Sequence, residues 1–229
     1  MVSALSTIIL GFLLGMRHAT DPDHVVAVAT IVSREQKLAP AAWIGALWGA
    51  GHTVTIAVVG GAIILFNWAV PARVGLLMEL AVGVMLVVLG LYNLRGLTRL
   101  TRLTGLTGGG QVVARFRSGQ IVRPFFVGIV HGLAGSAAVA LVVLTTIRRP
   151  LWGVAYLLVF GVGTVAGMAL VTTAIAAPFA YSTRRFEIHH QSKLQLATGM
   201  LSVAFGLFLV YKIGYVDGLF SAAPQWVPE

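Results

Sequence analysis

Long apolar segments follow one another along almost the whole chain, and they constrain its fold more than any other feature. A transmembrane helix needs about 20 mainly apolar residues, and the charged share of 10% is far below the quarter or so that is usual in soluble domains. We therefore predict an all-α integral membrane protein with six transmembrane helices, forming one polytopic domain over residues 1–229. The predicted spans cover residues 4–32, 40–67, 74–97, 123–147, 151–178 and 193–216.

The residues outside the predicted spans, and the composition of the chain, exclude several function classes. No stretch is left for a separate water-soluble domain of even about 50 residues, so the function must lie in the helix bundle and its loops. The chain has no cysteine, which excludes disulfides, thiol redox chemistry and iron–sulfur clusters.

Basic residues are distributed unevenly between the predicted loops. Eleven of the 16 Lys and Arg lie in the loops after the first, third and fifth spans, four lie on the opposite side, and Arg17 lies within the first span. The positive-inside bias then predicts a multi-pass protein of the cytoplasmic membrane with both termini outside. It also explains the net charge of +9 without a nucleic-acid partner. Because no basic residue precedes Arg17, we expect residues 1–16 to begin a retained span rather than a cleaved signal peptide.

Residues 98–122 form the longest predicted connection and contain the string TRLTRLTGLT followed by GGG. A nucleotide-binding loop would need a preceding strand and a GxxxxGK[ST] arrangement, and neither is present. We interpret the segment as a basic cytoplasmic linker that contacts anionic membrane lipid.

The two halves of the chain, residues 1–97 and 123–229, resemble each other. Gly15 aligns with Gly128 and His18 with His131 at an offset of 113 residues, and GAGHT from Gly49 aligns with GVGTV at an offset of 112. At an offset of 116, the glycines at 83 and 90 align with those at 199 and 206. Because each half has an odd number of spans, the second must cross the membrane in the opposite sense, which predicts the inverted repeat of secondary transporters. Chance similarity of glycine-rich helices that pack closely is the alternative.

The first span is interrupted at its middle by RHATDPDH, residues 17–24. Each charged side chain at this depth costs about 2.5–3.5 kcal/mol, so a purely structural role is a poor explanation. Pro22 should kink or unwind the helix near Asp21. On a straight helix His18 and His24 would point about 240° apart, whereas a broken turn brings both to one pocket.

Imidazoles and carboxylates without thiolates are a ligand set for divalent Ni, Co, Zn, Mn or Fe. We therefore predict one metal site, with the candidate ligands His18, Asp21, Asp23, His24, His52 and His131. A single intramembrane histidine such as His52 or His131 is more often a packing residue than a ligand, but the repeat favours His131 as a ligand because it places His131 opposite His18. The site should be asymmetric, because Ser136 and Ala137 stand at the positions equivalent to Asp23 and His24.

Other polar residues leave alternatives open. Arg17 would offset Asp21 at the i, i+4 spacing if the helix persisted that far. Glu79 is either a paired or snorkelling carboxylate or a cation entry point. His189 and His190 are either solvated loop residues or a metal delivery point.

RHATDPDH resembles the RHAxDADH signature of the nickel/cobalt transporter family, in which His18, Asp23 and His24 match the core positions. GAGHTVT is similar to the second, GH-containing motif of that family and carries over His52. The HGLAGSAA string at His131, and Pro22 where alanine is usual, look more like the urease-accessory-type membrane relatives. The resemblance implies movement of Ni²⁺ or Co²⁺ across the cytoplasmic membrane, with the ion as substrate and no prosthetic group.

We therefore predict a secondary transporter of Ni²⁺ or Co²⁺ and not an enzyme. A membrane metal-delivery partner of urease or hydrogenase maturation proteins is the first alternative, and a homo-oligomer is compatible with either. A membrane acyltransferase is the second alternative, because His18 and Asp23 also match a His-x4-Asp pair in which Asp orients His as a general base.

Overall fold

The computed structural model describes residues 4–33, 35, 37–68, 70–103, 122–134, 150–182, 188–222 and 224–226. Over these residues the chain is helical and contains no strand. Four helical stretches are long and apolar enough to cross a membrane: Leu38–Phe66, Ala72–Arg95, Pro150–Pro178 and Lys193–Val216. Three shorter apolar helices cover Ile8–His18, Pro22–Val32 and Val122–Ala134. The chain is thus an all-α membrane protein.

The first predicted span consists of two helices, α1 (Ala4–His18) and α2 (Pro22–Val32). Asp21, at the N-cap of α2, has an extended backbone with φ −60° and ψ 144°. Pro22 follows at the first helical position, where its missing N–H costs nothing. The backbone N–H groups of Thr20 and Asp21 instead close a turn onto the carbonyls of the last α1 residues. The chain therefore breaks between His18 and Pro22, within the stretch where the sequence predicts it.

The other helices are long. α3 (Leu38–Thr55) continues through a π-helical segment, η1 (Ile56–Gly60), into α4 (Gly61–Phe66). α5 covers Ala72–Leu103, and α7 covers Pro150–Ser182. α8 (Ile188–Tyr211) ends in a second π-helical segment, η2 (Lys212–Val216). α5 extends beyond the predicted span end at residue 97, because leucine and arginine favour helix. Residues 104–121 of the predicted linker and residues 135–147 of the fourth span lie outside the described residues.

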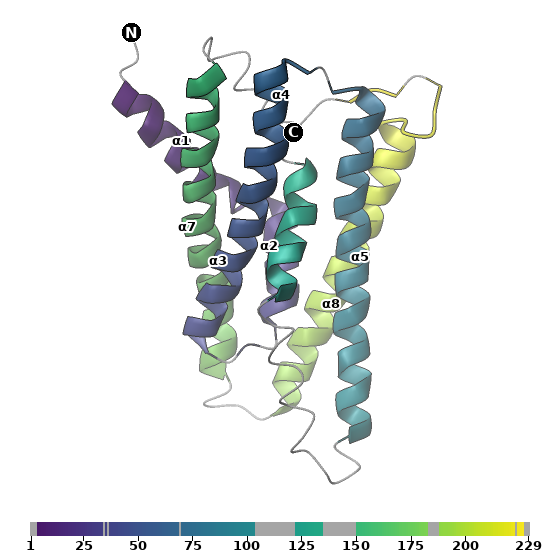
Figure 1. The fold of residues 1–229 in the computed structure, drawn as a ribbon. Coiled ribbons are helices and arrows are strands. Elements are labelled where there is room, and N and C mark those ends of the chain that lie inside the picture. Colours follow the sequence, from purple (N-terminus) through teal and green to yellow (C-terminus); the bar gives the residue numbers. More distant parts are fainter. Residues whose placement is uncertain are drawn as a thin grey trace.

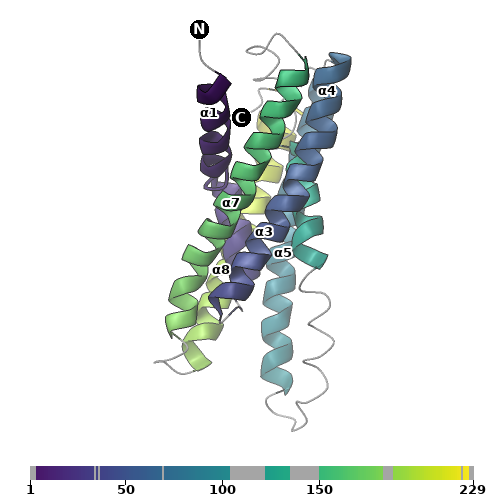
Figure 2. The same ribbon diagram turned by 60° about the vertical axis from the view of Figure 1, so that its left-hand side comes forward.

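The helices pack mainly as three pairs: α5 against α8, α3 against α7, and α1 against α7 (Figures 1 and 2). α3 and α7 run antiparallel, because Gly45 meets Met168 and Gly49 meets Val165 further back along α7. Figure 1 shows the same opposition, with both chain ends at the upper end of the bundle.

α1 and α7 run parallel. Gly11 lies against Tyr156, and Gly15, one turn later, lies against Phe160. A Cβ atom at Gly15 would clash with the carbonyl oxygen of Phe160, so the two helix backbones are in direct contact. This close approach depends on glycine.

The Val122–Ala134 helix runs parallel to α3 in the same way. Gly128 lies against Trp48, and Gly132 lies against Thr55. The Thr55 hydroxyl also donates a hydrogen bond of 3.0 Å across this contact to the carbonyl of Ile129. The second half of the chain is thus fixed directly against the helix that carries His52.

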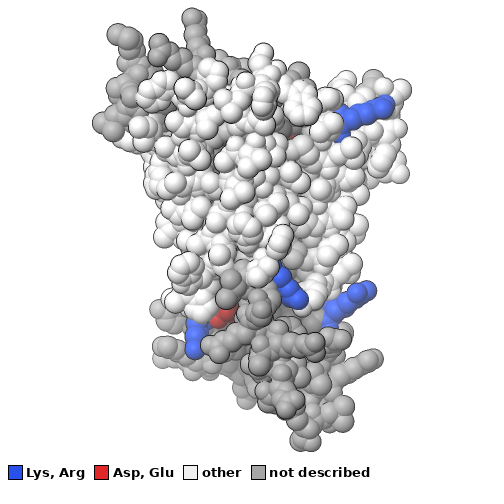
Figure 3. All heavy atoms as spheres, in the orientation of Figure 1, with Lys and Arg blue, Asp and Glu red and all other residues white. Residues whose placement is uncertain are grey.

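The surface of the bundle is largely apolar. Large side chains such as Leu13, Val58 and Val162 are about half or more exposed, as expected for residues that face lipid. On the face drawn in Figure 3, the described Lys, Arg, Asp and Glu residues lie toward the two ends and leave a broad uncharged band between them. The buried core is built mainly from α2, α3, α5 and α7, around Val28, Trp48 and Leu86.

Candidate metal centre

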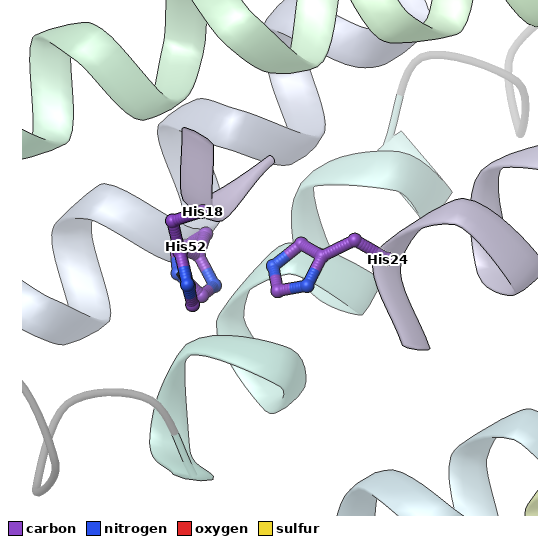
Figure 4. A group of neighbouring side chains, drawn as sticks. All are labelled: His18, His24 and His52. Carbon is purple, nitrogen blue, oxygen red and sulfur yellow. Dashed lines mark hydrogen bonds between the residues drawn. The ribbon is translucent and has the colours of Figure 1, made fainter. Parts of the chain in front are cut away.

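The break between α1 and α2 brings histidines from four helices together. His18 is the last residue of α1, His24 lies in the first turn of α2, His52 lies near the end of α3, and His131 lies in the Val122–Ala134 helix. The ring centroids of His18 and His24 are 4.6 Å apart, although the two residues are six positions apart in sequence. Figure 4 shows His18, His24 and His52 turned toward one common space.

His18 connects the break to α3. Its Nε2 lies 3.1 Å from Nε2 of His52, and its Nδ1 lies 2.7 Å from Oδ2 of Asp21. Asp21 caps the start of α2, so the extended residues of the break present this carboxylate to the end of α1. The imidazole of His18 is therefore oriented by a carboxylate on one side while its other nitrogen points into the cluster.

Asp23 and His24 connect the break to the second half of the chain. Asp23 Oδ1 lies 2.9 Å from Nδ1 of His24, and Asp23 Oδ2 lies 3.1 Å from Nε2 of His131. The Nδ1 of His24 also lies 3.2 Å from Nε2 of His131. One carboxylate thus faces two imidazoles that come from different halves of the sequence.

Three of the four histidines lie deep in the bundle. The exposed fractions of His24, His52 and His131 are 1%, 0% and 2%. Each of them keeps one ring nitrogen with no hydrogen-bond partner: Nε2 of His24, and Nδ1 of His52 and of His131. A buried polar atom without a partner is costly, so these three nitrogens are available to a bound ion or water, in addition to the nitrogens that face one another in the cluster.

The spacing of the ligand atoms suits a metal ion. His18, His24 and His52 form one group, and Asp23, His24 and His131 form another, each with its ligand atoms within 4.8 Å of one another. Two nitrogens bound to one ion at about 2.0–2.1 Å lie roughly 2.9–3.4 Å apart for angles between right-angled and tetrahedral. The separations of 3.1 and 3.2 Å between histidine nitrogens fall within that range.

A cavity of about 440 Å³ opens onto the cluster. Both carboxylates of the break line it, together with the four histidines, and Glu79 of α5 and Lys212 of η2 lie in its wall. Glu79 accepts a hydrogen bond of 2.8 Å from the indole N–H of Trp226. The structure therefore gives Glu79 both a partner and a place in the wall of the cavity.

The predicted pairing of Arg17 with Asp21 is replaced by another contact. α1 ends at His18, so the i, i+4 geometry that would join Arg17 to Asp21 does not form, and Asp21 faces His18 instead. The side chains of His189 and His190 lie outside the described residues, as do Ser136 and Ala137.

Aromatic residues around the cluster did not emerge from the sequence. The fully buried Trp48 stacks on His24 with ring centroids 5.8 Å apart and meets His131 edge-on at 5.5 Å. Phe160 of α7 lies 5.5 Å from His18. Trp48 precedes His52 by four residues and so lies on the same face of α3. That spacing was the one available signal.

The contacts of Asp23 disfavour a His-x4-Asp acyltransferase pair. Such a pair needs Asp23 to orient His18, whereas the described contacts of its two oxygens are with His24 and His131. His18 is oriented by Asp21.

One known protein resembles the chain over nearly its full length. The urease accessory protein UreH of Bacillus sp. (strain TB-90) is 38% identical over 222 residues, which cover 96% of each chain. No protein-family model matches the chain. No solved structure matches it either.

Proposed function

Because the chain belongs to the family of the urease accessory protein UreH, we propose that it carries Ni²⁺ or Co²⁺ across the cytoplasmic membrane as a secondary transporter. His18, Asp21, Asp23, His24, His52 and His131 are the proposed ligands. The ion is the substrate, and no prosthetic group is required.

One observation carries this proposal. Two groups of possible ligands, one with His18 and His52 and the other with Asp23 and His131, share His24 in the interior of an apolar bundle. A histidine that served only for packing would not need to lie beside three other histidines. Imidazole and carboxylate are also the ligand types that suit divalent Ni and Co.

The charges of the site favour a divalent cation. Metal-binding imidazoles are neutral, so the two carboxylates of Asp21 and Asp23 supply a charge of −2 that a divalent ion neutralises. Their side chains are 46% and 31% exposed, whereas His24, His52 and His131 are almost completely buried. An ion that enters the cavity therefore meets carboxylate oxygens first and imidazole nitrogens afterwards.

Packing contacts support the inverted repeat that such a transporter uses. Gly15 lies against Phe160, and Gly128 lies against Trp48. Gly128 is the repeat equivalent of Gly15 at an offset of 113, and Phe160 is that of Trp48 at 112. The contact is thus made twice, with the halves exchanged, as a twofold axis between them requires.

The directions of the helices agree with this arrangement. α1 is parallel to α7, the Val122–Ala134 helix is parallel to α3, and α3 is antiparallel to α7. The first helices of the two halves therefore run in opposite directions, which is what distinguishes an inverted repeat from a parallel one. We propose six spans in all, with the fourth over residues 123–147 as the sequence predicts.

A reconstitution experiment tests the proposal. Purified protein in liposomes should take up Ni²⁺ or Co²⁺ into the lumen, measured by elemental analysis, and His24→Ala should abolish uptake. Val162→Ala on the lipid-facing side of α7 is the matched control and should transport normally. Uptake by the His24→Ala protein equal to that of the parent protein would contradict transport through this site. So would general leakage of the liposomes that does not depend on the metal ion.

The name of the relative favours a second candidate function, a membrane partner that delivers nickel for urease maturation. Liposomes that contain only this protein separate the two. A transporter moves the ion without other proteins, whereas a delivery partner binds it and releases it only to a maturation protein.

A further inference from the structure

A second, smaller cavity of about 130 Å³ lies toward the opposite end of the bundle. Its wall includes Thr30 of α2, Asn93 of α5, and Arg123 and Val127 of the Val122–Ala134 helix. On α5, Glu79 of the first cavity and Asn93 of the second are 14 residues apart, which corresponds to about 21 Å along the helix. The second cavity plays no part in the metal cluster.

The two cavities use equivalent positions of α5 and α8. The second is lined by Leu89, Tyr92 and Asn93, and the first by Phe205, Phe208 and Leu209. Each of the three α5 residues is 116 positions before its counterpart on α8. This is the offset that also relates the glycines of α5 to those of α8.

The glycine contacts between α5 and α8 follow the same symmetry. Gly83 lies against the carbonyl of Gly206, and Gly90 lies against that of Gly199. At the offset of 116, Gly83 corresponds to Gly199 and Gly90 to Gly206, so the two contacts exchange with each other. The second cavity therefore occupies the symmetry-related place of the first.

Little protein separates the two cavities. On the Val122–Ala134 helix, His131 lines the first and Val127, one turn earlier, lines the second. Between them lies an apolar layer that includes Val28 of α2 and Leu86 of α5, which are 1% and 0% exposed and belong to one packed cluster. A packed layer of apolar side chains is a barrier to a hydrated ion.

A polar contact crosses the wall of the second cavity. Arg123 donates a hydrogen bond of 2.7 Å from Nη1 to the hydroxyl of Tyr92, and its guanidinium lies 4.7 Å from the ring centroid. Both side chains are exposed, and they join the Val122–Ala134 helix to α5. The contact holds the Arg123 side chain across this wall of the cavity, which Glu35 also lines.

We propose that this second cavity is the cytoplasmic half of the ion pathway. The apolar layer that includes Val28 and Leu86 separates this cavity from the metal cluster. The Arg123–Tyr92 contact closes the end of the cavity that faces the cytoplasm. The ion leaves the cluster past Val127 when the two halves exchange conformations, as the symmetry of the cavities allows. This inference rests on the proposed transport function.

Filling the cavity tests the inference. Val127→Trp should reduce Co²⁺ uptake by liposomes severalfold while equilibrium Co²⁺ binding by the purified protein stays unchanged. Val162→Trp on the exposed side of α7 is the size-matched control and should change neither. Unchanged uptake by a folded Val127→Trp protein would overturn the inference.

Labelling provides a second measurement, because the chain has no cysteine of its own. Val127→Cys should react severalfold faster with a membrane-impermeant maleimide in inside-out vesicles than in right-side-out vesicles, and Phe208→Cys should show the reverse preference. Equal or reversed rates would overturn the inference. If the parent protein neither binds nor transports Co²⁺, the proposed function itself is wrong. If the Val127→Trp variant binds and takes up Co²⁺ like the parent protein, only the second cavity is rejected as a pathway.

Discussion

At the scale of single residues, His24 connects the parts of the site. Its Nδ1 faces Asp23 and His131, its ring lies 4.6 Å from that of His18, and its Nε2 has no partner. His18 belongs to α1 and His52 to α3, both in the first half of the chain, whereas His131 belongs to the second half. Loss of His24 therefore removes a proposed ligand that is common to both groups.

We expect His24→Ala to weaken Ni²⁺ binding by more than about 100-fold, because the loss of groups that only orient a ligand already costs roughly 10–100-fold. Isothermal titration of the purified protein measures this. His18→Ala should behave similarly. His189→Ala is the control, because His189 is not among the proposed ligands, and this variant should bind almost normally. Equal losses in the His24 and His189 variants would move the site away from the bundle interior.

Protons should compete with the ion for the same nitrogens. A protonated imidazole cannot bind a metal. Affinity for Ni²⁺ should therefore fall as the pH is lowered. Where it falls, the logarithm of the binding constant should change by more than one unit per pH unit, because several histidines bind together. Titrations from pH 7.5 down to the pH at which the protein unfolds test this, and an affinity that stays flat over that whole range would mean that the histidines are not ligands.

At the scale of the helices, the sequence predicted the break in the first span because Pro22 and the charged residues around it interrupt an apolar run. It also indicated which glycines permit close packing. It could not predict the buried network in which the Asn93 amide donates to the carbonyl of Gln195 at 3.2 Å. Hydropathy reports how apolar a segment is and not which helix it meets. The role of Trp48 was hidden for the same reason.

Gly15→Ala should destabilise the protein by about 1–3 kcal/mol, the usual cost of overpacking, because the new Cβ would clash with the Phe160 carbonyl and push α1 from α7. Gly61→Ala is the matched control, because a Cβ there has no atom within 4 Å. Thermal unfolding followed by circular dichroism in detergent compares the two. A Gly15 variant as stable as the Gly61 variant would show that the α1–α7 contact relaxes freely.

At the scale of the whole molecule, the pattern of six apolar segments predicted the membrane class, and the structure agrees through its four long apolar helices and three shorter ones. The offsets of 112, 113 and 116 indicated a repeat, and the odd number of spans in each half predicted opposite directions for the halves, but only the contacts show which helices pack together. The pairing of the cavities was not predictable, because a cavity depends on how side chains fail to fill the space between helices.

The driving force can be tested on the whole molecule. No ATP-binding motif is present in the sequence, so we propose that the membrane potential drives uptake. A divalent cation that moves inward gains about 4.6 kcal/mol from 100 mV, inside negative, which corresponds to roughly 10³-fold accumulation without a coupled ion. Liposomes that contain a potassium gradient and valinomycin set this potential. Internal Ni²⁺ should rise steeply with the imposed voltage, and His24→Ala liposomes should show no such rise. Accumulation that does not depend on voltage would instead require exchange for other cations of equal total charge.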